Sequence, residues 1–255
     1  PYVVIAPSYM VYSIDFDQFI HTHIDSGADV TLLYHSVDNA KEAYLTCNVL
    51  NLNRQKGVEA IGPNHGNKKN QNIYMDTCVM KTELFISLVR EAKKLSSMYT
   101  LADILNDKCE TLDIRGVAHK GFFASITDFP SYYAANMDLL DYKAAQELFH
   151  ENWPIYTRTN DSCPTQYFDT AEVKNSVISN GCQIEGTVEN SVIGRGCVIK
   201  KGAVVRNSVV LAEVTVGEDV HVENEVVDKW AKLIHKKEII SPADQPGYIK
   251  RNDTL

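Results

Sequence analysis

The segment NSVISNGCQIEGTVENSVIGRGCVIKKGAVVRNSVVLAEVTVGEDVHVENEVV, residues 175–227, decides the fold of the C-terminal part of the chain. Aliphatic residues recur along it at steps of five, six or nine residues: Ile178, Ile184, Ile193, Ile199, Val205, Val210, Val216, Val222 and Val227. An amphipathic helix would repeat its apolar positions every three or four residues. A strand meander would need turn signals between hairpin partners. The pattern therefore predicts a left-handed parallel β-helix, in which each hexapeptide forms a short strand and a corner.

Small residues mark the corners of this predicted β-helix. They follow several of the aliphatic residues by four positions: Cys182, Cys197, Ala203, Val214 and Val220. We expect them to point inward at tight corners, with Gly181, Gly196, Gly202 and Gly217 allowing the backbone to turn. The repeats amount to little more than three coils. That number is about the minimum for a continuous core, so the ends need a cover.

The composition of the chain is that of a globular protein. It has 255 residues, 44% of them hydrophobic, and a net charge of −8. The charge is evenly spread, with 13 basic and 18 acidic residues before Glu151 and 12 and 15 from there on. This balance argues against nucleic acid or an anionic membrane as the main partner. We find no apolar run long enough to cross a bilayer and no secretory signal, so we expect a cytoplasmic protein.

The six cysteines show no metal-binding or disulfide pattern. Cys182 and Cys197 fall at equivalent positions of adjacent coils, and we interpret both as small buried residues in a reducing compartment. The chain begins at Pro1, and a strand like those of protein cores follows at once. We therefore expect a longer protein whose N-terminal part precedes this residue.

The N-terminal part of the chain has the pattern of an α/β domain. A β-branched run at residues 2–6 predicts a strand covered on both faces. A helix capped by Asp15 or Ser13 then ends at Gly27, and a second buried strand covers residues 28–34. This order predicts a parallel βαβ unit. Further helices are expected after Thr82, after Thr100, and at Asp128 with Pro130.

We predict four regions along the chain. Residues 1–148 form a partial α/β domain, residues 149–170 a linker, residues 171–240 the β-helix, and residues 241–255 a loosely held tail.

Three segments in this order resemble a known family. They are a helix with the pattern Tyr-x-x-Ala-Asn-x-Asp-Leu at residues 132–139, the sequence Trp-Pro-Ile-Tyr-Thr at residues 153–157, and the hexapeptide repeats. Together they are similar to bacterial ADP-glucose pyrophosphorylases. The resemblance implies a Rossmann-like nucleotidyltransferase domain, Mg²⁺, tetramers, and the synthesis of ADP-glucose from ATP and glucose 1-phosphate. It places the Gly-rich phosphate loop upstream of Pro1.

The chain departs from the family where carboxylates would bind the metal. A Gly-Asp-His segment should follow the first strand, but Ala6, Pro7, Ser8, Tyr9 and Met10 stand there. Ser125 replaces the aspartate of a second motif. A Phe-x-Glu-Lys-Pro motif should fall between Glu59 and Asn72, and residues 60–64 supply neither its Glu nor its Lys. Lys68 and Lys69 are nearby, and we interpret them as residues of a solvated loop. Because a neutral hydroxyl brings no charge to Mg²⁺, we expect no catalytic residue and no bound cofactor in this chain.

This set of losses resembles the GlgD-type subunits of the family. It predicts a regulatory, catalytically deficient subunit in a hetero-tetramer with a GlgC-type catalytic subunit that holds the Mg²⁺, and it leaves a homo-oligomer open. One alternative is an active sugar-phosphate nucleotidyltransferase that uses other acids, such as Asp15 and Asp128. The other is a hexapeptide acyltransferase with His221 as its base.

The remaining candidates have competing structural interpretations. Six aromatic residues could line a sugar or nucleotide pocket or fill the core: Tyr9, Tyr12, Phe122, Phe123, Tyr132 and Tyr133. His21 and His23 are two positions apart on a helix and should point to different sides, which argues against a shared metal ion. Outward valines of the β-helix could contact a neighbouring subunit or other parts of this chain: Val192, Val204, Val209 and Val226.

Overall fold

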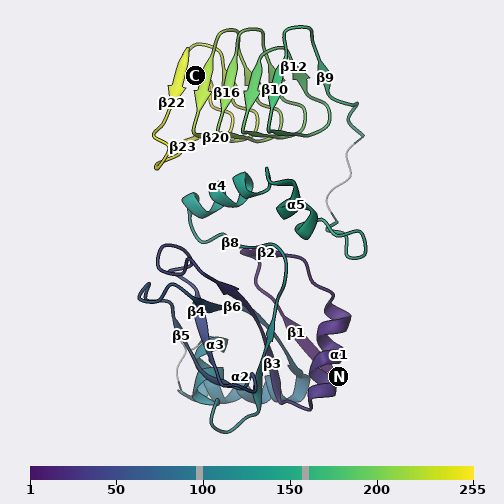
Figure 1. Cartoon of the computed structure of the whole chain (residues 1–255), viewed down its shortest axis with the longest axis vertical. Coiled ribbons are helices and arrows are strands. Elements are labelled where there is room, and N and C mark those ends of the chain that lie inside the picture. The colour runs from purple at the N-terminus through teal and green to yellow at the C-terminus, as the bar shows by residue number, and fades with distance from the viewer. Residues whose placement is uncertain (96–99, 157–160) are drawn as a thin grey trace. The chain divides into compact units, whose positions relative to one another are not determined.

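The computed structural model describes residues 1–95, 100–156 and 161–255. The chain divides into two compact units (Figure 1). Unit 1 comprises Pro1–Ser125 and Glu151–Trp153, and unit 2 comprises Ile126–His150 and Pro154–Leu255. The structure thus assigns residues 126–148 to the unit that contains the β-helix, whereas we expected them in the α/β domain. Of the predicted linker at 149–170, and of the motif at 153–157, residues 157–160 lie outside the described residues.

A six-stranded mixed sheet forms the centre of unit 1. Its order is β5-β4-β6-β3-β7, and β1 also pairs with β6. The strands are β1 (Tyr2–Ile5), β3 (Val30–Val37), β4 (Asn48–Leu52), β5 (Val58–Pro63), β6 (Gln71–Lys81) and β7 (Ile114–Ala118).

Two expectations for the first strands need correction. β1 and β3 are both antiparallel to β6 and so run parallel to each other, but β6 lies between them. The predicted parallel βαβ unit is therefore split by a later strand. Residues of β1 are half-buried or exposed, so the strand is not covered on both faces. Its apolar run suggested full burial, but among the described residues β1 pairs with β6 alone, so its other edge has no paired strand.

Helices cover both faces of this sheet. α2 (Thr82–Leu95) and α3 (Leu101–Asp107) pack on one face, where Leu32, Tyr74 and Leu105 belong to the core. α1 (Phe16–Ser26) places Phe19 in the core of the other face. The predicted ends of α1 are confirmed, since the Asp15 side chain accepts from the Gln18 backbone N–H and Gly27 has a left-handed backbone with φ 66°. Thr100 caps α3 as expected.

A two-stranded ribbon accompanies the larger sheet. β2 (Met10–Tyr12) pairs antiparallel with β8 (Phe123–Ser125), and Met10 lies opposite Ser125. The ribbon joins segments more than one hundred residues apart in the sequence. We did not predict β2, because its three residues are too short for a periodic signal.

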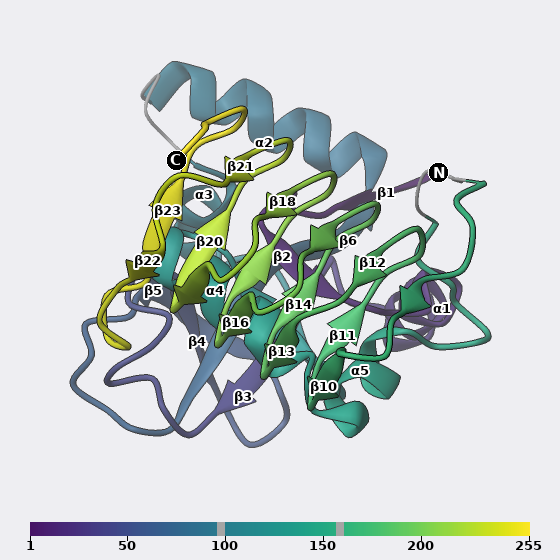
Figure 2. The same cartoon turned by 90° about the horizontal axis from the view of Figure 1, so that it is seen from above.

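Unit 2 contains the parallel β-helix, whose short strands stack in register (Figure 2). Three sheets of five strands form its faces. The first holds β10 (Glu172–Lys174), β13 (Thr187–Glu189), β16 (Val204–Arg206), β19 (His221–Glu223) and β22 (Glu238–Ile240). The second holds β11 (Val177–Ile178), β14 (Val192–Ile193), β17 (Val209–Val210), β20 (Glu225–Val227) and β23 (Gly247–Ile249). The third holds β9 (Gln166–Tyr167), β12 (Gln183–Ile184), β15 (Val198–Ile199), β18 (Thr215–Val216) and β21 (Lys232–Leu233).

The inward positions of the β-helix agree with the prediction. The recurring aliphatic residues from Ile184 to Val227 are fully buried, and the small residues at the corners join them in a single core. Gly181, Gly196 and Gly202 have a left-handed backbone, as expected, but Gly217 does not. Gly217 is required for a different reason. A Cβ there would lie 2.9 Å from the carbonyl oxygen of Leu233 in the next coil.

The β-helix is longer than predicted at both ends. It begins with β9 at Gln166, before the expected start at residue 171, and it includes β23 within the segment we interpreted as a loose tail. Ile249 is buried, and the Leu255 backbone N–H donates to the carbonyl of Lys232. The two prolines in this segment suggested disorder, but the backbone continues the parallel pairing after them.

Two helices pack within unit 2. They are α4 (Phe129–Asp138), capped by Asp128 as expected, and α5 (Tyr142–Leu148), which we did not predict. α4 lies against β17, and the Tyr133 hydroxyl donates to the carbonyl of Asn207 at 2.5 Å. Val209 and Val226 are buried although they point away from the β-helix core. Two of the four outward valines are thus covered by the chain's own residues.

Candidate functional site

The β2–β8 ribbon brings together the two places where the family carboxylates were expected. Ser8 and Tyr9 come directly before Met10, and Met10 lies opposite Ser125. In the sequence, Tyr9 and Ser125 are more than one hundred residues apart. In space they belong to one neighbourhood, which is the candidate site.

A carboxylate that the sequence analysis missed lies in the same neighbourhood. Asp76 interrupts the apolar run of β6, at an irregularity in the pairing of β6 with β3, and its backbone has φ 46°. This local distortion of the strand orients the side chain toward the Tyr9 hydroxyl, which donates to Asp76 Oδ2. An acid within the run IYMDTCVM was the signal that could have identified it.

Burial disfavours the charged form of this carboxyl group. It raises the pKa of Asp76, although the hydrogen bond from Tyr9 opposes the shift. The pKa of Tyr9 is raised as well, first by burial and then by the hydrogen bond to Asp76. The hydroxyl therefore remains protonated and donates to the carboxylate.

Ser125 has a neutral partner. Its Oγ lies 3.3 Å from Cys47 Sγ, and the serine is 7% exposed. Burial raises the pKa of the Cys47 thiol. This side of the site therefore presents a hydroxyl and a thiol, which bring no charge to a metal ion. With Asp76 as its only carboxylate, the described donor set of this neighbourhood does not fit the paired-carboxylate Mg²⁺ site that the family resemblance implies.

A cavity of about 300 Å³ adjoins Asp76. It lies at the carboxyl end of β1, which is where open α/β sheets usually bind ligands. Its lining is mostly apolar or neutral: Ile5, Ala6, Pro7, Asn48, Tyr74, Asp76, Thr100, Leu101 and Ala102. The volume is at the lower end of the range for small-molecule sites, roughly 300–1,000 Å³.

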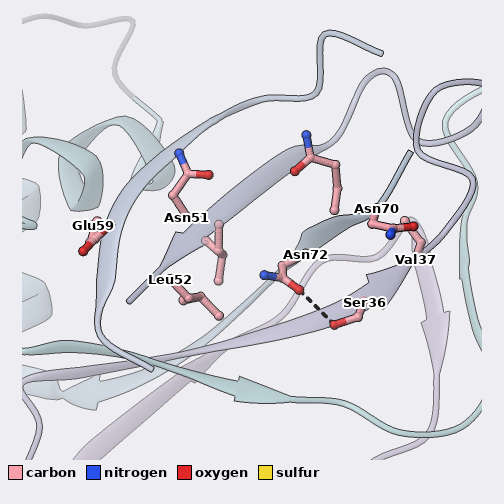
Figure 3. Close-up of a pocket in the computed structure, with 9 residues that line it drawn as sticks. Ser36, Val37, Asn51, Leu52, Glu59, Asn70 and Asn72 are labelled. Carbon is pink, nitrogen blue, oxygen red and sulfur yellow. Dashed lines mark hydrogen bonds between the residues drawn. The ribbon is translucent and has the colours of Figure 1, made fainter. Parts of the chain in front are cut away.

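A larger hollow of about 490 Å³ lies at the carboxyl end of β3 (Figure 3). Its lining is rich in side-chain amides: Ser36, Val37, Leu50, Asn51, Leu52, Glu59, Asn70, Gln71 and Asn72. Ser36 Oγ donates to Asn72 Oδ1 at 2.8 Å, as the dashed line in Figure 3 shows. The neighbouring Asn64 has a structural role, since its buried amide donates to the carbonyl of Ala40 at 2.8 Å. Lys68 and Lys69 are exposed.

Comparisons with known proteins agree with this architecture. A profile of the family described as "GlmU-like, C-terminal hexapeptide" matches residues 164–245. The protein "Glycogen biosynthesis protein GlgD" of Geobacillus stearothermophilus is 32% identical over 204 residues, covering 80% of this chain and 49% of the relative. The chain is a homologue of GlgD proteins. A second GlgD, of Bacillus subtilis, is 26% identical over 250 residues, covering 98% of this chain and 62% of that protein.

The same comparisons reach named enzymes. "Glucose-1-phosphate adenylyltransferase" of Fervidobacterium nodosum is 28% identical over 230 residues, covering 89% of this chain and 54% of that enzyme. The resemblance drawn from the sequence motifs is therefore confirmed at the level of homology. The chain spans about half the length of the curated relatives it matches first.

The two acids proposed as substitutes for the lost carboxylates are engaged at helix ends. Asp15 caps α1. Asp128 caps α4, where its carboxylate accepts from the Ser131 backbone N–H at 2.8 Å. Hydrogen bonds from the side chain and then from the backbone of Ser131 lower the pKa of Asp128. Both side chains have a structural task.

The histidine candidates are placed apart from one another. His21 is exposed, whereas His23 is buried with its Nδ1 2.8 Å from Thr31 Oγ1, as expected for positions on different sides of a helix. His221 Nε2 lies 3.2 Å from Glu223 Oε2 on β19. Among the residues the structure describes, no group of three or more His, Cys, Asp or Glu side chains is arranged to hold a metal ion.

The six aromatic candidates do not form one pocket. Phe122 and Phe123 are buried, and Phe123 stacks on Tyr44 with ring centroids 5.5 Å apart. Tyr132 and Tyr133 belong to α4 in unit 2, whereas the other four belong to unit 1. Within the described residues, no helix is both long and apolar enough to span a bilayer.

Proposed function

We propose that this chain belongs to a regulatory, catalytically deficient subunit of glucose-1-phosphate adenylyltransferase that acts in glycogen biosynthesis. The names of its homologues support a role in glycogen biosynthesis, since two are called glycogen biosynthesis protein GlgD and a third is called glucose-1-phosphate adenylyltransferase. In this role the chain keeps the fold of the enzyme and changes the activity of a catalytic partner.

One observation carries the catalytic deficiency. The pairing of Met10 with Ser125 collects neutral side chains where two carboxylates would be needed. Transfer of the adenylyl group from ATP to a sugar phosphate, with release of pyrophosphate, requires Mg²⁺ to offset the charge of the phosphates, and Mg²⁺ is held by carboxylate oxygens. Asp76 offers a single carboxylate, and Tyr9 already donates to it. The charge available for a metal ion is therefore smaller than the family chemistry requires.

The partner in this proposal is a GlgC-type catalytic subunit, with a hetero-tetramer as the assembly. The catalytic subunit supplies Mg²⁺ binding, and this chain binds no cofactor of its own. Two of the outward valines, Val192 and Val204, are partly exposed on the β-helix and remain available for a contact between subunits.

A second function, an active sugar-phosphate nucleotidyltransferase, is favoured by Asp76. This acid lies beside a cavity at the carboxyl end of a strand, where a substrate would bind. In that case the single carboxylate would hold the metal, and Asp76→Asn would abolish activity.

The experiment is an assay of ADP-glucose formation from ATP, glucose 1-phosphate and Mg²⁺, with the complete protein alone and mixed with a GlgC-type subunit. The expected result is no formation by the complete protein alone and a changed rate or activator response in the mixture. Formation by the complete protein alone at the partner's rate would overturn the proposal. Loss of that activity in Asp76→Asn would then identify the acid responsible.

A further inference from the structure

A third cavity of unit 1, of about 330 Å³, belongs to neither place described above. It lies between the first turns of α1 and the carboxyl end of β7, with Trp153 at its rim. The lining combines apolar and polar residues: Ser13, Ile14, Asp15, Gln18, Phe19, Thr22, Leu33, Val117, Ala118, His119, Lys120 and Trp153. A mostly apolar lining with a small number of polar groups that point toward the same space is typical of a small-molecule site.

The apolar part of this lining suits a flat ring. Phe19 and Leu33 are buried core residues of the sheet face, so this part of the wall is rigid. Trp153 is 36% exposed and presents an indole at the rim. An indole offers a large apolar surface with one N–H donor. A sugar ring has the matching form, since its C–H face is apolar and its edge carries hydroxyls.

The polar part offers both donors and acceptors. Asp15 accepts hydrogen bonds, Gln18 offers both functions through its amide, and Lys120 only donates. The Thr22 hydroxyl donates to the Gln18 carbonyl at 2.8 Å, which fixes its oxygen as an acceptor. Each hydroxyl group of a ligand can donate one hydrogen bond and accept others. A lining with both donors and acceptors can therefore pair with such hydroxyl groups.

The formal charges of the acid and the amine that line the cavity balance each other. The lining contains one carboxylate, Asp15, and one ammonium group, Lys120, so the formal charges cancel. His119 is already hydrogen-bonded within the protein. Its Nε2 donates to the Ser13 carbonyl at 3.0 Å, and its Nδ1 lies 3.2 Å from Nδ1 of His35, so one of these two atoms carries no proton. Burial and the neighbouring His119 lower the pKa of His35. With the charges of Asp15 and Lys120 balanced, a ligand without net charge matches the lining.

We propose that this cavity is a binding site for a neutral saccharide unit, separate from the neighbourhood of Asp76 and Ser125. Trp153 packs on the ring face, and Gln18 with Asp15 hydrogen-bonds the hydroxyls. This inference goes beyond the proposed function, because it requires binding without turnover and does not depend on a catalytic partner.

The two tryptophans of the chain allow a direct test. Trp230→Phe keeps Trp153 and removes the other tryptophan of these 255 residues. Trp153→Phe keeps Trp230, which is similarly exposed at 42% and stacks with Arg251 in unit 2. Glucose and maltose are titrated into both variants of the complete protein, and tryptophan emission is recorded. We expect a saturable change in the first variant and none in the second.

Further variants locate the site. In the Trp230→Phe background, Gln18→Ala should weaken saccharide binding by roughly three- to tenfold, the range for one net hydrogen bond. His21→Ala changes an exposed residue of the same helix outside the cavity and should leave binding unchanged. No emission change up to about 10 mM saccharide, a limit typical of very weak sites, would overturn the proposal. An equal response from Trp230, or unchanged binding in Gln18→Ala, would overturn it too. Tighter binding of glucose 1-phosphate than of glucose at Trp153 would reject a neutral ligand.

Discussion

At the residue scale, the described part of the candidate site contains one carboxylate, that of Asp76, which accepts a hydrogen bond from the Tyr9 hydroxyl. Asp76 lies in β6, a strand whose other central residues are mostly buried, and its backbone has a positive φ. A conformation of this kind is uncommon for residues other than glycine and is found most often for Asn and Asp. The hydrogen bond from Tyr9 connects β6 with the segment before β2. The tyrosine thus links two elements at the point where the family needs acids.

Tyr9→Phe should destabilise the protein by about 1 kcal/mol. The substitution removes the donor to Asp76 and leaves a half-buried carboxylate without it. The effect is modest because Tyr9 is 37% exposed and water can replace part of the interaction. Urea unfolding measures the loss. Tyr2→Phe is the matched control, since Tyr2 is 40% exposed and should give little change. Equal effects of the two variants would contradict the role of Tyr9.

The raised pKa of Asp76 predicts a pH dependence. Because the folded carboxyl group binds its proton more tightly than the unfolded one, the folded protein holds more protons between the ordinary value of 3.8 and the raised pKa. Stability therefore falls as pH rises through this window. We expect the wild-type protein to gain stability relative to Asp76→Asn as pH is lowered from neutral toward 3.8. Urea unfolding at several pH values measures the difference, and the exposed-acid variant Asp25→Asn gives the background. A difference that grows in the opposite direction would reject this assignment.

At the scale of elements, the β-helix shows how one coil supports the next. Each strand pairs in parallel with strands one coil away, fifteen to seventeen residues apart for most of its length. Asparagines at one corner repeat with the coils, and Asn175, Asn190, Asn207 and Asn224 all have positive φ. The Asn175 side chain donates to Asn190 Oδ1 at 2.8 Å. Asparagine tolerates this backbone better than most residues, so the corner needs no glycine.

Ile199→Ala should destabilise unit 2 by about 2–5 kcal/mol. The side chain is fully buried in the core, and its removal leaves a cavity between coils. The adjacent Val198 points outward and is partly exposed, so Val198→Ala should cost less than about 1 kcal/mol. Thermal unfolding of both variants checks the contrast. Similar losses would mean that the inward and outward sides are wrongly assigned.

Gly186→Ala should be strongly destabilising, although the substitution adds only one methyl group. A Cβ at this position would lie 2.4 Å from the carbonyl oxygen of Ala203 and 2.7 Å from that of Lys200, so the backbone of the next coil would have to move. We expect a loss of more than about 2 kcal/mol in thermal unfolding. Gly62→Ala is the control, because its Cβ would meet nothing within 4 Å. It should change stability by less than about 1 kcal/mol.

At the scale of the whole molecule, the proposed function depends on assembly. Unit 1 carries the neighbourhood of Asp76, and unit 2 carries the β-helix with its partly exposed outward valines. In the proposed function, this chain acts in ADP-glucose synthesis through a partner that supplies the paired carboxylates.

Light scattering over a dilution series should therefore reveal assembly. We expect the complete protein mixed with a GlgC-type subunit to form a species heavier than either protein alone, because the partly exposed valines Val192 and Val204 offer an apolar surface for a contact between subunits. Monomers in every sample, with and without the partner, would contradict the assembly. The activity assay of the same samples connects mass with function.

Local patterns in the sequence predicted the ends of elements well. Asp15, Thr100 and Asp128 each begin a helix, because a side-chain cap needs only the next two or three residues. The β-helix core was predicted because its signal is local too, since the sequence of every coil contains the hexapeptide repeat. Its length was underestimated, because the first strand and the last strand depart from the hexapeptide pattern.

Contacts between distant segments were not predictable from these patterns. No periodicity indicates that β6 lies between β1 and β3, or that Met10 pairs with Ser125. The sequence showed that acids were absent from two motifs, but not that Asp76 comes close to both. The hydrogen bond between Tyr9 and Asp76 joins residues 67 positions apart, and it depends on an irregularity within a strand.

The sequence by itself determined the β-helix, the helix caps and the resemblance to its homologues, because each of these rests on residues near one another in the chain or on motifs. The tertiary structure decided which strands are neighbours, which outward valines are covered, and which side chains surround the candidate site. The physical reason is that these features depend on pairing and packing between segments far apart in the chain. Such contacts form only when the whole unit folds, so a local sequence pattern does not predict them.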